Sequence, residues 1–128
     1  MIVDKIDGVT RIPVEYLKPS VPAPKSVKIE LTARCNYLCS FCALRTREVK
    51  PKGDIDFKLF KKITMEIKDA GVEEIGLFYL GESFMAPDVL IGAIEWCKQE
   101  LEIPYVFLTT NGSLAEKDLV FDAMKAGL

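Results

Sequence analysis

The residues of this sequence that could do chemistry are three closely spaced cysteines. Cys35, Cys39 and Cys42 follow the pattern C-x3-C-x2-C within one eight-residue stretch. Structural zinc takes four Cys or His ligands and a four-iron cubane usually takes four thiolates, so three thiolates leave such a centre one ligand short. The sequence has no histidine, and its one other cysteine, Cys97, lies far along the chain. The loop therefore predicts a metal centre with an open coordination position, which suggests catalysis.

Other uses of these cysteines stay open. A zinc site could borrow Cys97 or a ligand from another chain, and an unrelated iron–sulfur site is a further alternative. A disulfide framework is disfavoured because three clustered cysteines cannot all pair, and because Met1 to Lys5 lack the form of an export signal. Cys97 lies on an apolar stripe of an expected helix, so we expect a buried core thiol.

Length and charge exclude several classes of protein. The 128 residues suit one domain, and a hydrophobic content of 49% is enough to build a core. Seventeen basic and nineteen acidic residues give a net charge of −2, which argues against a nucleic-acid partner. No apolar run approaches the roughly 20 residues of a membrane span, so no membrane partner is expected. Reduced, clustered thiols favour a cytoplasmic location.

Strands and helices alternate after a distinct N-terminal segment. Residues 1–24 predict a β-hairpin around Asp7-Gly8 and then a proline-rich linker, with a disordered leader as the alternative. Beyond it, strands are expected at residues 27–31, 74–80 and 105–109, and helices at residues 57–70, from 87 and from 113 to about 127. This alternation predicts an α/β fold with a parallel sheet and right-handed crossovers.

Local signals mark where each helix begins or ends. Asp56 can cap the first helix, and Gly71 fits the position just after its end. Pro87 suits the first turn of the second helix. Ser113 and Glu116 have the spacing of a capping box, which predicts that the third helix begins at Ser113.

Alternation in the first strand assigns its two faces. Residues 27, 29 and 31 are apolar and should lie beneath the helices, whereas Lys28, Glu30 and Thr32 should point to the opposite side. A charged side facing the interior of a barrel-like sheet is costly unless it is wet or binds a ligand. A solvated edge strand is the alternative.

Polar motifs follow all three strands. The cysteine loop follows the first strand, Gly81-Glu82-Ser83 follows the second, and Thr109-Thr110-Asn111-Gly112 ends the third. Because ligands bind at the carboxyl edge of parallel strands in such folds, we expect these motifs to meet in one site.

The cysteine spacing, with Phe41 directly before the third cysteine, resembles the signature of the radical S-adenosylmethionine (SAM) superfamily. The resemblance implies a [4Fe-4S] cluster held by Cys35, Cys39 and Cys42, whose remaining iron binds the amino and carboxylate groups of SAM. It implies that an electron from the cluster cleaves SAM to a 5′-deoxyadenosyl radical, which abstracts a substrate hydrogen. A flavodoxin-type or ferredoxin-type electron donor is the implied partner. The implied fold is a partial, open TIM-like barrel, of which this chain would supply the three N-terminal βα units.

Gly81-Glu82 resembles the family's GGE segment, which meets the methionyl amino group of SAM. A carboxylate such as that of Glu82 can accept a charge-assisted hydrogen bond from an ammonium group. The sequence departs from the pattern, because Leu80 stands at the first glycine position and Ser83 replaces a proline. An ordinary turn with a solvated glutamate is the alternative.

The third motif and two aromatic residues complete the implied cofactor site. The Thr110-Asn111-Gly112 segment resembles the family's TNG segment, so Asn111 would contact the ribose or carboxylate of SAM through its amide. A simple turn is the alternative. Tyr37 and Phe41 flank the thiolates and are expected to shield the cluster from water.

The segment Leu31-Thr32-Ala33-Arg34-Cys35-Asn36 is most similar to members that carry an extra C-terminal iron–sulfur domain of the SPASM or twitch type. Such members modify peptides, cofactor precursors or sugars. We expect residues 25–128 to form the N-terminal half of a radical SAM core within a longer enzyme. A short protein that completes its sheet by association is the alternative.

Basic residues surround the cysteine loop: Arg34, Arg45, Arg47, Lys50 and Lys52. They predict either a solvated basic loop or a surface for the acidic patch of a reductase or for an anionic substrate. From another class of function, a non-catalytic zinc or iron–sulfur binding module remains the alternative to an enzyme.

Overall fold

Three parallel strands form the centre of the molecule. The computed structural model describes residues 17, 19, 22–49 and 53–128. The sheet has the order β1-β2-β3, formed by β1 (Ser26–Lys28), β2 (Glu74–Gly76) and β3 (Tyr105–Phe107). Its register pairs Val27 with Ile75 and Ile75 with Val106. The predicted parallel α/β arrangement is confirmed, although each regular strand is shorter than predicted.

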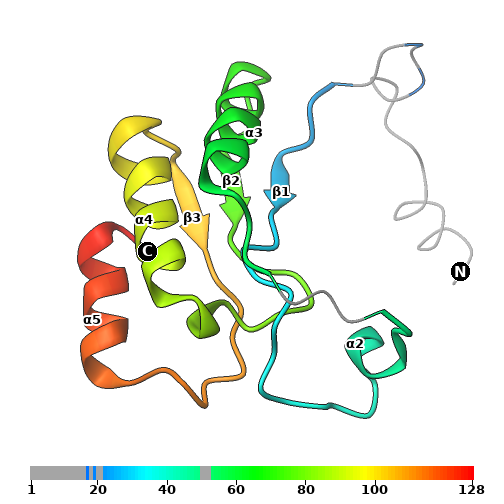
Figure 1. Ribbon diagram of the computed structural model, residues 1–128. Helices are drawn as coiled ribbons and strands as arrows, with labels where there is room; N and C mark the ends of the chain where they lie inside the picture. The colour runs from blue at the N-terminus through cyan, green and yellow to red at the C-terminus, as the bar shows by residue number, and fades with distance from the viewer. Residues whose placement is uncertain (1–16, 18, 20–21, 50–52) are drawn as a thin grey trace, which may run out of the picture.

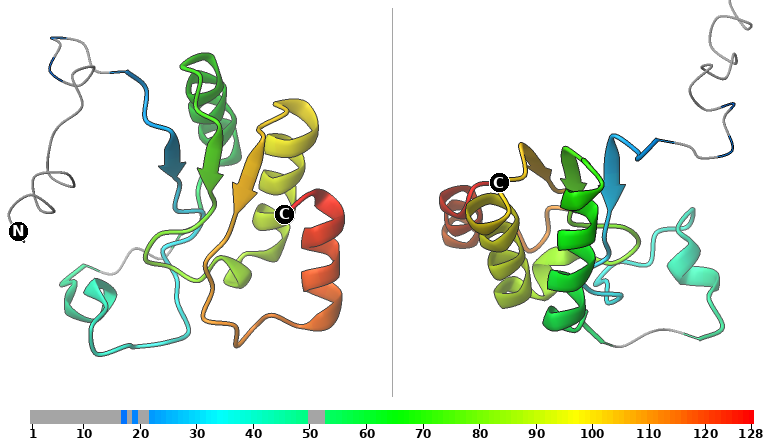
Figure 2. Two further views of the ribbon diagram at one scale, coloured as in Figure 1. Left: turned by 180° about the vertical axis from the view of Figure 1, so that it is seen from behind. Right: turned by 90° about the horizontal axis from the view of Figure 1, so that it is seen from above.

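Helices cover one face of this sheet, and one short helix lies apart from it. The helices are α2 (Ala43–Thr46), α3 (Phe57–Asp69), α4 (Pro87–Glu95) and α5 (Lys117–Ala126), with a 3-10 turn η2 (Ser83–Met85) and a π-helical turn η3 (Trp96–Glu100). Figures 1 and 2 show α3, α4 and α5 on the same side of the strands. The strand arrows of Figure 1 point toward the end of the molecule where α2 lies. The short helix α2 was not predicted.

Three of the local helix signals act as predicted. A carboxylate oxygen of Asp56 accepts the backbone N–H of Leu59 at 2.9 Å, which caps the first turn of α3. Gly71 follows α3 with a φ of +85°, a left-handed conformation that glycine adopts at little cost. Pro87 occupies the first turn of α4, where the missing N–H of proline costs no hydrogen bond.

The prediction that the third helix begins at Ser113 is wrong. Helix α5 begins at Lys117, with Glu116 as its N-cap residue and without a side-chain capping bond. The hydroxyl of Ser113 instead donates to Oδ1 of Asn111 at 2.7 Å. A local turn therefore uses the hydroxyl that a capping box would need.

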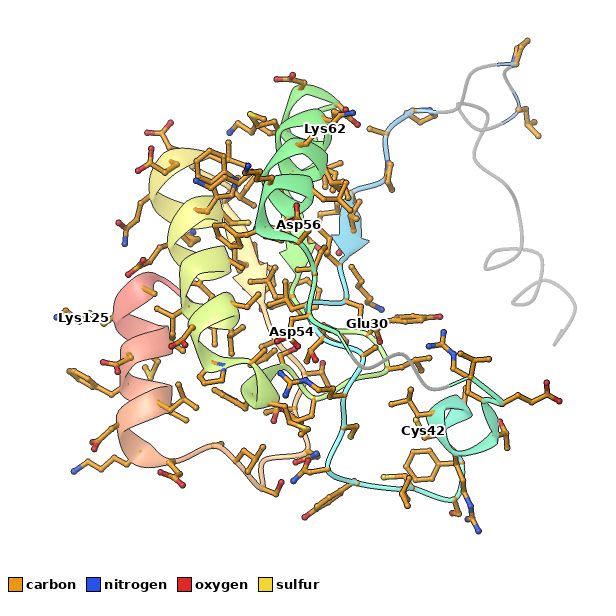
Figure 3. All side chains as sticks on the ribbon, viewed as in Figure 1. Glu30, Cys42, Asp54, Asp56, Lys62 and Lys125 are labelled. Atoms are coloured by element: carbon orange, nitrogen blue, oxygen red, sulfur yellow. The ribbon has the colours of Figure 1, made fainter. Side chains whose placement is uncertain are left out.

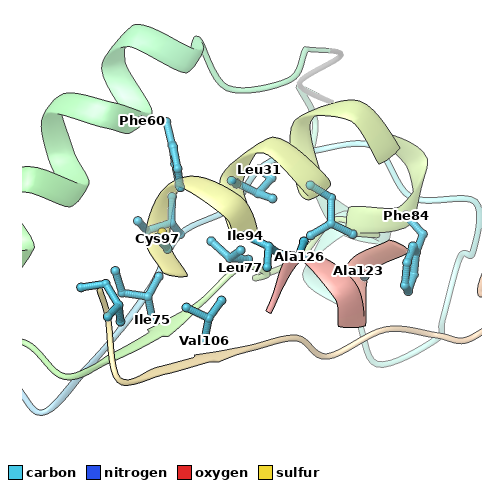
Figure 4. Close-up of a cluster of buried hydrophobic side chains, with 14 residues drawn as sticks. Leu31, Phe60, Ile75, Leu77, Phe84, Ile94, Cys97, Val106, Ala123 and Ala126 are labelled. Carbon is cyan, nitrogen blue, oxygen red and sulfur yellow. The ribbon is translucent and has the colours of Figure 1, made fainter. Parts of the chain in front are cut away.

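The core lies between the sheet and the three long helices. Figure 4 shows Leu31, Phe60, Ile75, Leu77 and Ile94 among its side chains, and each of these is 0% exposed. The face assigned to residues 29 and 31 of the first strand is therefore confirmed.

Cys97 belongs to this core, as the sequence predicts. Its side chain is 0% exposed, and burial raises the pKa of its thiol to about 12. A thiol with such a pKa stays protonated near neutral pH, so Cys97 behaves as a small hydrophobic residue.

The other face of the sheet carries aromatic and charged side chains. The ring of Phe78 packs edge-on against Phe107, which in turn stacks on Tyr105. The ammonium group of Lys28 lies 5.6 Å from the centre of the Phe78 ring. Thr32, expected on this side, is 3% exposed, and its hydroxyl accepts the backbone N–H of Arg34 at 3.2 Å.

The predicted hairpin around Asp7-Gly8 lies outside the described residues. In the described part of the chain, no helix combines the length and apolar character that a membrane span requires.

Candidate functional site

The loops after the three strands meet around one cavity, as the sequence predicts. The cavity has a volume of about 350 Å³ and opens at the carboxyl edge of the sheet. Its lining residues come from all three loops: Cys35, Tyr37, Cys39, Phe41, Cys42, Phe78, Tyr79, Leu80, Gly81, Glu82, Thr109, Thr110 and Asn111. Eight of the nine residues predicted for the cofactor site are therefore in one place.

Ser83 is the predicted site residue that the cavity does not include. Its side chain is 1% exposed, and its hydroxyl donates to the carbonyl oxygen of Leu77 at 2.7 Å. The hydroxyl thus satisfies a backbone acceptor at the end of the second strand, which gives Ser83 a structural task.

The three cysteines share the cavity without converging on one point. Each of Cys35, Cys39 and Cys42 is half-buried, and the N–H of Cys42 donates to the carbonyl oxygen of Cys39 at 3.1 Å. Among the described residues, no three His, Cys, Asp or Glu side chains lie close enough to hold a single metal ion. Each thiolate of a cubane binds a different iron, so cluster ligands stand farther apart than the ligands of one ion. Three thiols along one cavity are a donor set of the right chemistry for such a cluster.

Arg34, directly before the first cysteine, fastens the start of the cysteine loop. Its guanidinium donates to both carboxylate oxygens of Asp54 at 2.8 Å and to the carbonyl oxygen of Met85 at 2.9 Å. The hydroxyl of Thr32 and the guanidinium of Arg34 hold the pKa of Asp54 below its ordinary value. Asp54 lies beside the loops in Figure 3.

Glu30 holds the loop after β2 through hydrogen bonds to its backbone. One carboxylate oxygen of Glu30 accepts the backbone N–H groups of both Leu80 and Gly81 at 3.0 Å. Figure 3 shows Glu30 where the first strand runs into the cysteine loop. The sequence placed Glu30 on the charged face of its strand but did not predict its partners. The partners are backbone amides, and the carboxylate is thereby satisfied in a half-buried position.

Gly81 lies against the chain just before the cysteines. A β-carbon built on Gly81 would lie 1.9 Å from the carbonyl oxygen of Thr32. The next N–H, that of Glu82, donates to the carbonyl oxygen of Arg34 at 2.8 Å. A glycine is therefore required here by the close approach of two loops, whatever contact it makes with a cofactor.

Glu82 joins the second loop to the third. Its side chain is 2% exposed, and Oε1 accepts the N–H of Phe84 at 3.1 Å and the hydroxyl of Thr110 at 2.9 Å. Oε2 accepts the N–H of Asn111 at 2.7 Å. A carboxylate offers about four acceptor positions, so one position on Oε2 remains for a donor in the cavity.

Asn111 reaches across to the cysteine loop. Its Nδ2 donates to Oδ1 of Asn36 at 2.9 Å and lies 3.9 Å from Sγ of Cys35. Asn36, which sequence reasoning did not select, is thus a further site residue, and only the fold reveals its partner far along the chain.

The aromatic residues and the basic residues are exposed to different degrees. Phe41 is 91% exposed and Tyr37 is 47% exposed, so their role in shielding a cluster stays a prediction. Arg45 and Arg47 are exposed on and after α2, whereas Lys50 and Lys52 lie outside the described residues.

Comparison with known families decides what this site belongs to. Residues 29–128 match the family model described as the radical SAM superfamily. The chain belongs to the radical SAM superfamily.

Curated relatives include two proteins named S-adenosylmethionine-dependent nucleotide dehydratase RSAD2. The one from Danio rerio is 37% identical over 95 residues, and the one from Oncorhynchus mykiss is 34% identical over 95 residues. Each alignment covers 71% of this chain but only 25% and 26% of the two relatives.

Solved structures of BtrN share the fold. The crystal structure of BtrN in complex with AdoMet and 2-DOIA superimposes with a TM-score of 0.73 at 16% identity, covering 81% of this chain and 42% of BtrN. BtrN in an open conformation gives a TM-score of 0.71 at 14% identity, covering 87% of this chain and 49% of that one. The likeness confirms the predicted partial TIM-like barrel.

Proposed function

We propose that this chain forms the cluster-binding and SAM-binding part of a radical SAM enzyme. The observation that carries the proposal is the single cavity that Cys35, Cys39, Cys42 and Glu82 line together. Membership of the superfamily and the incomplete thiolate set support the same conclusion, because three thiolates leave one iron of a cubane open for a ligand.

The residues of the chain would divide the work at this site. The three thiolates would hold a [4Fe-4S] cluster, which supplies the electron that splits SAM into methionine and a 5′-deoxyadenosyl radical able to take a hydrogen atom from substrate. The remaining acceptor position of Glu82 would receive an N–H of the methionyl ammonium group. Tyr37 and Phe41 would keep water from the cluster, and Gly81 would keep the second loop against the cysteine loop.

Product formation tests the proposal. Anaerobic reconstitution should load about four irons and four sulfides per chain, as a cubane requires. With SAM and dithionite, the loaded chain should form 5′-deoxyadenosine and methionine in equal amounts. The Cys39→Ala variant should form neither product, whereas Cys97→Ala, altered at a buried core position, serves as the matched control. One zinc per chain, with no 5′-deoxyadenosine, would support the non-catalytic metal-binding module instead.

The class of substrate can be found by testing candidate classes in the same assay. Peptides, cofactor precursors and sugars follow from the sequence resemblance, and the name of the curated relatives adds nucleotides. We propose nucleotides as the first class to test, with deuterated substrates and deuterium transfer into 5′-deoxyadenosine as the readout. The chain spans about a quarter of the length of these relatives. Where a longer natural form of the protein exists, the substrate assay should use that form.

We also propose a flavodoxin-type or ferredoxin-type electron donor in a reducing cytoplasm. Arg45 and Arg47 provide exposed positive charge next to the third cysteine, and acidic electron carriers would be attracted to such a surface. Replacing both arginines by glutamine should slow cluster reduction by an acidic flavodoxin and leave reduction by dithionite unchanged. Equal slowing with both reductants would count against a docking role.

A further inference from the structure

A closed ring of hydrogen bonds joins Asn36, Asn111 and Ser113 beside Cys35. Nδ2 of Asn36 donates to Oγ of Ser113 at 2.7 Å, and that hydroxyl donates to Oδ1 of Asn111 at 2.7 Å. Nδ2 of Asn111 donates back to Oδ1 of Asn36 at 2.9 Å, which closes the ring. The ring therefore connects the loop after β1 with the loop after β3 through side chains alone.

The ring uses the whole amide of Asn111. An amide oxygen has two lone pairs and an amide nitrogen has two hydrogens. Oδ1 accepts the hydroxyl of Ser113 and also its backbone N–H, at 2.7 Å and 2.9 Å. Nδ2 gives one hydrogen to Asn36 and lies 3.9 Å from Sγ of Cys35, at the outer range of hydrogen bonds to sulfur. In this arrangement Asn111 has no donor or acceptor to spare for SAM.

The position of the amide nitrogen matters for the chemistry of Cys35. Sγ of Cys35 also receives the backbone N–H of Tyr37 at 3.5 Å, so two N–H groups approach this one sulfur. Hydrogen bonds to ligand sulfurs tune the reduction potential of an iron–sulfur cluster. Reduction adds negative charge, so donors aimed at a ligand sulfur stabilise the reduced state and raise the potential.

We propose that Asn111 is a positioning residue for the cluster. Its amide, fixed by Asn36 and Ser113, donates to the thiolate of Cys35 and raises the reduction potential of the cluster. This inference rests on the proposed function, because it requires a cubane bound through Cys35. It differs from the role expected from the family resemblance, in which Asn111 contacts SAM.

Redox titration without SAM tests the proposal. The full chain and the Asn111→Leu variant are loaded anaerobically, and their midpoint potentials are measured by dithionite titration followed by electron paramagnetic resonance. Asn111→Leu should change the equilibrium between oxidised and reduced cluster by up to about tenfold toward the oxidised form, which is ~59 mV for one electron. The affinity of the loaded chain for SAM should change by less than about twofold, since the amide makes no contact with SAM.

A matched pair of variants separates the ring from general damage. Ser113→Ala removes the hydroxyl that fixes Oδ1 of Asn111, whereas Ser113→Thr keeps it at an exposed position with room for a methyl group. The alanine variant should shift the potential in the same direction as Asn111→Leu, and the threonine variant should restore the wild-type value. This pair decides the matter if Asn111→Leu fails to hold its cluster.

The outcomes that overturn the inference are specific. Potentials equal to wild type in Asn111→Leu, or equal in Ser113→Ala and Ser113→Thr, show that the ring does not tune the cluster. An unchanged potential with weakened SAM binding would make Asn111 a SAM contact instead. If the wild-type chain forms no cubane, both the proposed function and this inference fail. If the wild type forms a cubane whose potential the variants leave unchanged, this inference alone fails.

Discussion

Gly81 lies so close to the backbone of Thr32 that no residue larger than glycine fits at position 81. A β-carbon on Gly81 would lie 1.9 Å from the carbonyl oxygen of Thr32, and 3.0 Å from that of Arg34. Thr32 and Arg34 lead directly into the cysteine loop, so this approach fixes where the loop begins. Glu30 supports the same contact from the strand by accepting the N–H of Gly81 at 3.0 Å.

Replacing Gly81 by alanine should therefore destabilise the chain strongly. Backbone atoms would have to move apart, and overpacking of this kind costs about 1–3 kcal/mol or more. Gly53→Ala is the matched control, because a β-carbon at Gly53 meets nothing within 4 Å. Urea unfolding of both variants without metal measures the difference. Equal unfolding midpoints for the two variants would contradict the close approach.

Glu82→Gln tests the link between the second and third loops. An amide can accept hydrogen bonds on one atom only, so at least one backbone N–H, of Phe84 or Asn111, loses its partner. An unsatisfied buried donor costs about 1–3 kcal/mol, and we expect unfolding of the metal-free chain to reflect this loss. The variant should also bind SAM about tenfold more weakly in the cluster-loaded form.

The exposed residue Glu95 provides the control for this change. Glu95→Gln removes the same charge from the surface of α4 and should leave both measurements near wild type. If Glu82→Gln weakened SAM binding but left the metal-free stability unchanged, the hydrogen bonds to Thr110 and Asn111 would carry no energetic weight.

The sequence predicted those features that depend on neighbouring residues. Asp56, Gly71 and Pro87 act at helix ends through their own backbone or side chains, and all three were located correctly. The order of strands placed the three loops at one edge because topology alone requires it. The polar partners across loops were not predicted, because Glu30 and Gly81 meet only after the sheet has formed.

Ser113 shows why one local signal failed. Its spacing from Glu116 is that of a capping box, yet its hydroxyl forms bonds with Asn36 and Asn111 instead. Asn36 lies in a different loop, far from Ser113 in the sequence. The residues around Ser113 therefore give no sign of the hydrogen bond that competes with capping. Local capping energies of about 1 kcal/mol are readily outweighed by several tertiary hydrogen bonds.

Cysteine variants should separate metal ligands from the core thiol. Alanine at Cys35, Cys39 or Cys42 should abolish a stable cubane, because two thiolates hold it too weakly. Cys97→Ala should keep its iron but lower the melting temperature, since it removes a buried sulfur from the core. Iron and sulfide analysis with thermal unfolding gives both quantities. Equal iron loss in Cys97→Ala and Cys39→Ala would contradict the assignment of three ligands.

The interactions of Asp54 with the hydroxyl of Thr32 and the guanidinium of Arg34 should make the stability of the fold depend on pH in the acid range. The folded-state pKa of Asp54 lies below its ordinary value of 3.8, so the carboxylate stabilises the fold above that pH and its contribution is lost as pH falls through the folded pKa. Asp54→Asn should lower the stability of the metal-free chain near neutral pH and have less effect near pH 3. A constant difference between variant and wild type at both pH values would exclude a role for this ionisation.

The outer edge of β3 should govern how the 128-residue chain associates. The N–H of Tyr105 and the carbonyl of Phe107 bond toward β2, so both backbone groups of Val106 point to the other side. Within the described residues no strand pairs with that side, and an edge with free backbone groups invites another strand. We expect the isolated chain to self-associate with rising concentration in sedimentation experiments. Tyr105→Lys adds charge at an exposed position of β3 and should reduce association. Met65→Lys adds the same charge on α3, which lies beside β2 and β1 in Figure 1, and should not. A monomer at every concentration, with high thermal stability and full SAM cleavage, would show that this edge needs no partner.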